Sequence, residues 1–79
     1  MSDTIVAEDV KNVNCEVVLK SVINSIKEQG YNPATQLAAY LSSGEPLFIT
    51  KHNGARNMIQ NFDRIELLEK VINIIMEKL

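Results

Sequence analysis

Apolar residues recur at helical spacing along two long stretches of the chain, residues 14–29 and the stretch that follows Asp63. The first stretch carries Val18, Leu19, Val22, Ile23 and Ile26. This spacing of three and four positions puts apolar side chains on one face of an α-helix. Asn14 suits the N-cap of that helix, and Gly30 suits the left-handed position that ends it.

A second helix is predicted directly after the first. Asn32 is a favourable N-cap, and Pro33 suits the first helical position, where its missing N–H costs nothing. The helix ends near Ser43 and Gly44, because glycine commonly follows a helix and Pro46 cannot continue it. The link between the two helices is only residues 30–32, so we expect a helix–turn–helix-like corner.

The final stretch predicts the clearest helix. Asp63 and Glu66 have the spacing of a capping box. The apolar positions that follow are Leu67, Leu68, Val71, Ile72, Ile74, Ile75 and Leu79. This arc is wider than one face of a small helical bundle needs. Either the helix is enclosed by its own domain, or its second side contacts a partner.

The remaining segments are short. Residues 1–13 show no helical stripe and are expected to form a flexible N-terminal tail before a helical domain over residues 14–79. Residues 45–50, EPLFIT, predict a short extended segment, residues 51–54 a turn, and residues 55–61 a short helix. The expected fold is an all-α, compact domain of four to five helices.

Composition narrows the function. The chain has 79 residues with one cysteine, Cys15, and one histidine, His52, which leaves no intrachain disulfide and too few ligands for a structural zinc site. Domains this small often gain stability by oligomerisation, so we expect a homodimer. No signal peptide or membrane-spanning stretch is evident, and a cytoplasmic location is expected.

Candidate chemistry is sparse. Cys15 and His52 lie far apart in sequence, so we expect no enzyme, no cofactor and no metal site. A helix–turn–helix DNA-binding module is the alternative, although the net charge is −2 and the second helix carries no arginine or lysine. Arg56 and Arg64 form the only arginine cluster, suited to carboxylate or phosphate or to bridging helices within the fold.

An ordered series of residues resembles the IreB/ReoM family of regulatory phosphoproteins. The series begins with Gly30, Tyr31, Asn32, Pro33, Gln36, Tyr40 and Gly44. It continues with Pro46, Ile49, Thr50, His52, Ala55, Arg56 and Asn57. The resemblance extends over residues 17–79, most of the chain.

This resemblance implies a cytoplasmic, helical homodimer in a Gram-positive bacterium. It implies that Thr4 is phosphorylated by a serine/threonine kinase with extracellular PASTA domains and dephosphorylated by a partner phosphatase. It further implies control of peptidoglycan precursor synthesis, and with it envelope-antibiotic tolerance, through Clp-dependent proteolysis.

The resemblance also implies partner-binding positions, namely His52, Arg56, Asn57 and Arg64. Phosphate adds about −1.5 to −2 charge, so a phosphorylated tail is expected either to dock onto Arg56 and Arg64, which we favour, or to be repelled from an acidic partner. Gln60 and Asn61 stand where basic residues are common in the family, so the basic surface is thinner here.

Overall fold

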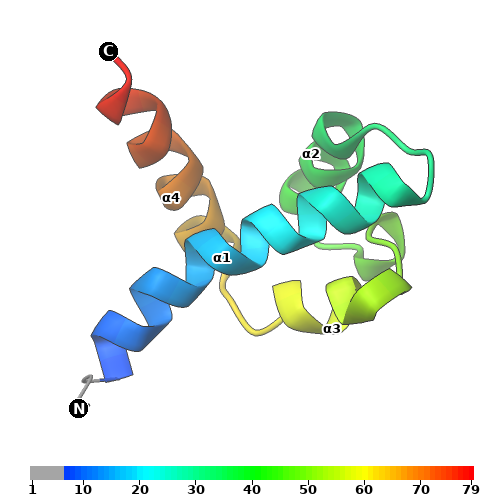
Figure 1. Cartoon of the computed structure of the whole chain (residues 1–79), viewed down its shortest axis with the longest axis horizontal. Helices are drawn as coiled ribbons and strands as arrows, with labels where there is room; N and C mark the ends of the chain where they lie inside the picture. Colours follow the sequence, from blue (N-terminus) through cyan, green and yellow to red (C-terminus); the bar gives the residue numbers. More distant parts are fainter. Residues whose placement is uncertain (1–6) are drawn as a thin grey trace.

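The computed structural model describes residues 7–79, with side chains from Cys15 onward. Four α-helices follow one another in this part of the chain (Figure 1). They are α1 (Ala7–Glu28), α2 (Pro33–Ser43), α3 (Ala55–Ile59) and α4 (Arg64–Glu77). No strand occurs between residues 7 and 79. The predicted all-α class is therefore confirmed for the described residues.

The start of α1 differs from the prediction. The helix begins at Ala7, so Asn14 lies inside it and does not cap it. A helix that is already nucleated propagates through residues of good helix propensity such as Ala7, Glu8 and Lys11 without an apolar stripe. Thr4 and the rest of residues 1–6 lie outside the described part of the chain, and so does that portion of the predicted tail.

The core lies along the second half of α1. Its buried face carries Cys15, Leu19, Val22 and Ile26, spaced by four, three and four positions. In Figure 1 this half of α1 runs between α2 on one side and α3 on the other. The residues that complete the buried cluster are Tyr40, Ile49, Ala55, Ile59 and Leu67. The other elements of the domain thus pack around one apolar stripe on α1.

The predicted signals at both ends of α2 are confirmed. Asn32 Oδ1 accepts a hydrogen bond from the backbone N–H of Thr35 at 3.1 Å, and Pro33 occupies the first turn. Gly44 follows the helix in the left-handed region at φ 78°, and its N–H donates to the Tyr40 carbonyl. These caps fix the length of α2 between two short connections.

The predicted extended segment over residues 45–50 is wrong. Pro46–Phe48 forms a 3-10 helix, and the Glu45 carboxylate caps it by accepting from the backbone N–H of Leu47 at 3.1 Å. Proline favours the first turn of a helix, and a capping carboxylate satisfies one of its open N–H groups. A second 3-10 helix, His52–Gly54, makes the predicted turn, with Asn53 in the left-handed region at φ 56°.

The last helix, α4, begins as predicted and then leaves the body of the domain. Asp63 and Glu66 form the capping box, in which the Asp63 N–H donates to Glu66 Oε1 at 3.1 Å. Figure 1 shows the end of α4 and the start of α1 projecting on the side away from α2 and α3. None of the described helices combines the length and apolarity needed to cross a membrane.

Candidate functional site

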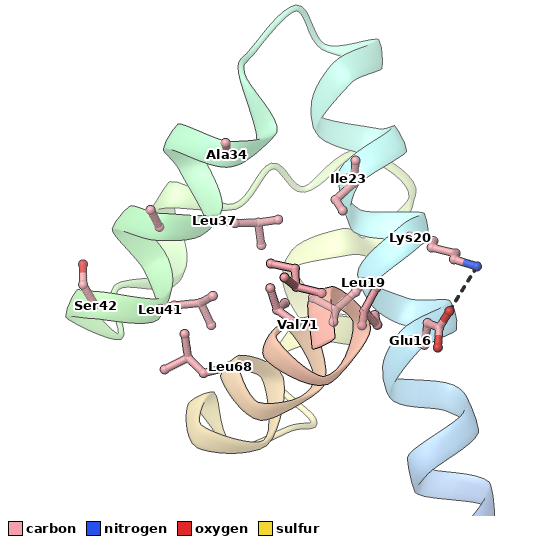
Figure 2. A pocket seen from close by; sticks show the side chains of 13 residues that line it. Glu16, Leu19, Lys20, Ile23, Ala34, Leu37, Leu41, Ser42, Leu68 and Val71 are labelled. Carbon is pink, nitrogen blue, oxygen red and sulfur yellow. Dashed lines mark ion pairs between the residues drawn. The ribbon is translucent and has the colours of Figure 1, made fainter. Parts of the chain in front are cut away.

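An apolar groove lies between three helices of the described part of the chain, and we call it the α1–α2–α4 groove. It measures about 680 Å³, and Figure 2 shows leucine and valine side chains from three helices pointing into it. Its principal apolar residues are Leu19 and Ile23 from α1, Leu37 and Leu41 from α2, and Leu68, Val71, Ile74 and Ile75 from α4. The ion pair between Lys20 Nζ and Glu16 Oε2, 3.2 Å long, lies at its edge (Figure 2).

Apolar exposure on α4 extends beyond this groove. Only Leu67 of α4 is fully buried. Large apolar side chains that stay exposed on α4 or directly after it are Ile65, Leu68, Val71, Ile72, Ile75, Met76 and Leu79. Contiguous exposed apolar surface of this kind marks an interaction site in soluble proteins. The wide apolar arc is therefore not enclosed by its own domain.

A second hollow, the polar pocket, lies at the other end of the core. It measures about 310 Å³ and is lined by Lys51, Arg56, two glutamines and exposed apolar side chains. Arg56 is the only one of the four predicted partner-binding residues that lines it. The structure thus separates Arg56 from His52, Asn57 and Arg64 at this pocket.

One wall of the polar pocket is the backbone that follows the first 3-10 helix. Gln36 Nε2 donates to the Phe48 carbonyl at 2.9 Å, and Arg56 Nε donates to the Ile49 carbonyl at 2.8 Å. The backbone N–H of Arg56 donates to the Thr50 carbonyl at 3.0 Å. Three consecutive carbonyls are therefore bound by α2 and α3, which fixes both the wall and the direction of the Arg56 side chain.

Arg64 is engaged within the fold. Its Nη1 donates to the Leu41 carbonyl near the end of α2 at 3.1 Å. A Cβ added to Gly44 would lie 2.9 Å from Arg64 Cζ, so the guanidinium rests directly against the glycine. Arg64 thereby fastens the start of α4 to the end of α2, and its predicted role in partner binding stays a prediction.

Replacing Gly44 by alanine is expected to lower the free energy of unfolding by about 1–3 kcal/mol. The left-handed backbone strains any side chain, and the new methyl group displaces Arg64 from Leu41. Gly54→Ala is the matched control, because Gly54 has φ 72° but no atom within 4 Å of an added Cβ. Urea denaturation of both variants gives the comparison. Equal losses would mean that the Arg64 contact contributes nothing to stability.

His52 joins the second 3-10 helix to α1. Its Nε2 lies 2.7 Å from Glu28 Oε1, and Asn53 Nδ2 donates to the same carboxylate oxygen at 3.2 Å. Asn53 also reaches the buried hydroxyl of Ser25 at 3.4 Å. Asn57 is exposed on α3. His52 thus has a structural partner, and its role in binding another protein stays a prediction.

Cys15 and His52 do not form a nucleophilic pair. His52 contacts Glu28, which lies thirteen helical residues beyond Cys15, a rise of about 20 Å. Cys15 itself is buried. Within the described residues, no group of three histidine, cysteine or carboxylate side chains is placed to hold a metal ion.

The exposed side chains of α2 do not support the alternative of a DNA-binding module. These side chains are Ala34, Thr35, Ala38, Ser42 and Ser43, which supply no cation for a phosphate. A recognition helix in the major groove relies on polar and basic side chains that reach base edges. The surface of α2 instead borders the apolar groove.

Sequence reasoning identified the apolar residues that α1 and α4 contribute to the groove, but it did not identify those of α2 and missed the polar pocket. Leu47 and Phe48 were expected to lie in an extended segment, so their exposure beside Lys51 and Arg56 was not foreseen. The available signal was Pro46 directly after Glu45, a pair that starts a short helix.

Comparison with known families agrees with these features. The sequence model described as IreB regulatory phosphoprotein matches residues 3–77, nearly the whole chain. The matched region contains all four helices, the groove and the polar pocket. The chain therefore belongs to the IreB family of regulatory phosphoproteins.

Proposed function

We propose that this protein is a phosphorylation-controlled regulator that works as a homodimer through contacts with other proteins. Family membership over residues 3–77 is the observation that carries the regulatory part of the proposal. The apolar groove and the exposed arc of α4 support the homodimer.

Self-association follows from complementary apolar surfaces. Each copy has an apolar groove that is open to solvent. Each copy also has Ile72 and Met76 exposed on α4 outside that groove. In a two-fold dimer the same patch serves both partners, so residue i contacts j and j contacts i. An α4 placed in the groove of a second copy would cover both surfaces at once. Charged residues at the groove are limited to Glu16 and Lys20, which already pair with each other.

Regulation is proposed to act on Thr4. The kinase is a membrane serine/threonine kinase with PASTA domains, and a partner phosphatase reverses the modification. In this proposal the unmodified protein restrains peptidoglycan precursor synthesis in the cytoplasm through Clp-dependent proteolysis, which sets envelope-antibiotic tolerance. These steps rest on the family resemblance.

The length of α1 limits where the tail can act. From Ala7 to Ile26, which lines the polar pocket, the helix rises about 29 Å. Between Thr4 and Ala7 the chain reaches about 10 Å even when fully extended. A phosphate on Thr4 therefore cannot reach Arg56 of its own chain while α1 is helical. This length favours an effect of the phosphate near the start of α1 or on a second molecule over docking onto Arg56 of the same chain, and docking onto Arg64 stays a prediction.

Incubation with the catalytic domain of a PASTA-domain kinase is expected to place one phosphate on Thr4, measured by tandem mass spectrometry. Thr4→Ala should abolish the modification, whereas Ser2→Ala, the matched control in the same segment, should leave it intact. Modification at another residue, or none in the wild type, would contradict Thr4 as the regulated site.

A further inference from the structure

The polar pocket carries positive charge on a protein that is acidic overall. Its lining contains Lys51 and Arg56 and no carboxylate, whereas the chain has a net charge of −2. Within residues 15–79, the Lys51 ammonium and the Nη atoms of Arg56 form no hydrogen bond or ion pair. Two cations are thus available for an anionic group from outside the domain.

Exposed apolar side chains stand beside these cations. Tyr31 is 60% exposed, Leu47 72% and Phe48 40%, and all three line the pocket. The fold leaves them in water although the wall that carries Phe48 is held by hydrogen bonds from Gln36 and Arg56. Aromatic side chains and arginine dominate the binding energy of protein interfaces. The combination indicates contact with a protein.

The size of the pocket also favours a peptide. At about 310 Å³ it lies at the lower limit for small-molecule sites, which run from about 300 to 1,000 Å³. Such a hollow accepts one or two side chains, and the exposed Tyr31, Leu47 and Phe48 stand at it. Nucleic acid would require a longer row of cations than Lys51 and Arg56 provide.

We propose that the polar pocket binds an acidic segment of a partner protein. An anionic side chain of that segment lies between Lys51 and the free edge of the Arg56 guanidinium. A neighbouring aliphatic side chain packs on Leu47 and Phe48. This inference rests on the proposed action through protein contacts, but it depends neither on Thr4 nor on the apolar groove.

Nuclear magnetic resonance titration of the full unmodified chain tests the site. The probe is a blocked heptapeptide of alternating leucine and aspartate, and the amides of Leu47, Lys51 and Arg56 should shift and saturate. Lys51→Glu should weaken binding about tenfold, because a charge-assisted contact is lost. The matched control is Lys78→Glu, which makes the same charge change at the end of α4 and should leave affinity within about twofold.

Three further arms define the ligand. A peptide with asparagine for aspartate should not bind, and Leu47→Ser should weaken the parent peptide without unfolding the domain because Leu47 is exposed. A peptide with phosphothreonine in place of the central aspartate is compared with the parent peptide. The tighter binder of the two shows whether the pocket prefers phosphate or carboxylate. Shifts absent with both anionic peptides, or equal affinity in Lys51→Glu and Lys78→Glu, would overturn the proposal. Neither result would bear on phosphorylation of Thr4.

Discussion

Ile75→Asp is expected to raise the dissociation constant of the homodimer by about a hundredfold or more. Ile75 lines the α1–α2–α4 groove and is exposed in the single chain. In the dimer it would be covered, so a carboxylate there would lose its water without gaining a partner. Sedimentation equilibrium over a range of concentrations measures the constant.

Asn73→Asp is the matched control for this variant. It introduces the same charge two residues away, and Asn73 is exposed on α4 but does not line the groove. Two helical residues turn the side chain by about 200°, so Asn73 points away from the face of Ile75. Its dissociation constant should stay within about threefold of the wild type. Equal weakening by both variants would show that charge on α4, and not coverage of the groove, governs association.

Leu67→Ala is expected to lower the free energy of unfolding by about 2–5 kcal/mol. Leu67 has no exposed surface and joins α4 to the core around α1, so the truncation leaves a cavity in the buried cluster. A domain of this length has only a few kcal/mol of stability to lose. Urea denaturation followed by circular dichroism gives the measurement.

The neighbouring leucine provides the control. Leu68 is 38% exposed and lines the groove, so Leu68→Ala should cost a single copy less than about 1 kcal/mol. The difference in unfolding free energy between the wild type and Leu68→Ala should instead grow with protein concentration, because the substitution removes a contact between copies. If Leu68→Ala matches Leu67→Ala at every concentration, the assignment of one leucine to the core and the other to the interface is wrong.

Local signals predicted much of the fold. Asn32, Pro33 and Gly44 fixed the ends of α2, and Asp63 with Glu66 fixed the start of α4, because each satisfies a specific backbone group or dihedral angle. The apolar spacing on α1 placed its buried face correctly. These features depend on residues a few positions apart and need no knowledge of the tertiary structure.

Other features depend on contacts that no local pattern reveals. The first turns of α1, which begins at Ala7, carry no apolar stripe, so no sequence pattern marks the start of this helix. The direction of Arg56 follows from the Ile49 carbonyl, and that of Arg64 follows from Leu41 and Gly44. Sequence alone therefore grouped the two arginines as one cluster, whereas Arg64 serves the junction of two helices and Arg56 lines a pocket with Lys51.

The family motif acquires a physical meaning from these contacts. Asn32 and Gly44 cap α2, Gln36 and Arg56 hold the loop carbonyls, and Tyr40 is buried in the core. These five residues of the motif thus hold the ends of α2, the loop carbonyls beside the polar pocket and the core. Exposed groups beside the motif, Lys51 and Leu47 above all, are then the places to look for differences in partner choice.

Coverage of the apolar groove by a second copy is tested most directly by the mass of the full wild-type chain in solution. The monomer mass is 8.9 kDa. Sedimentation equilibrium at micromolar to tens of micromolar protein is expected to give twice that mass. A single species of 8.9 kDa across that range would contradict the homodimer and would leave the groove without the occupant proposed here.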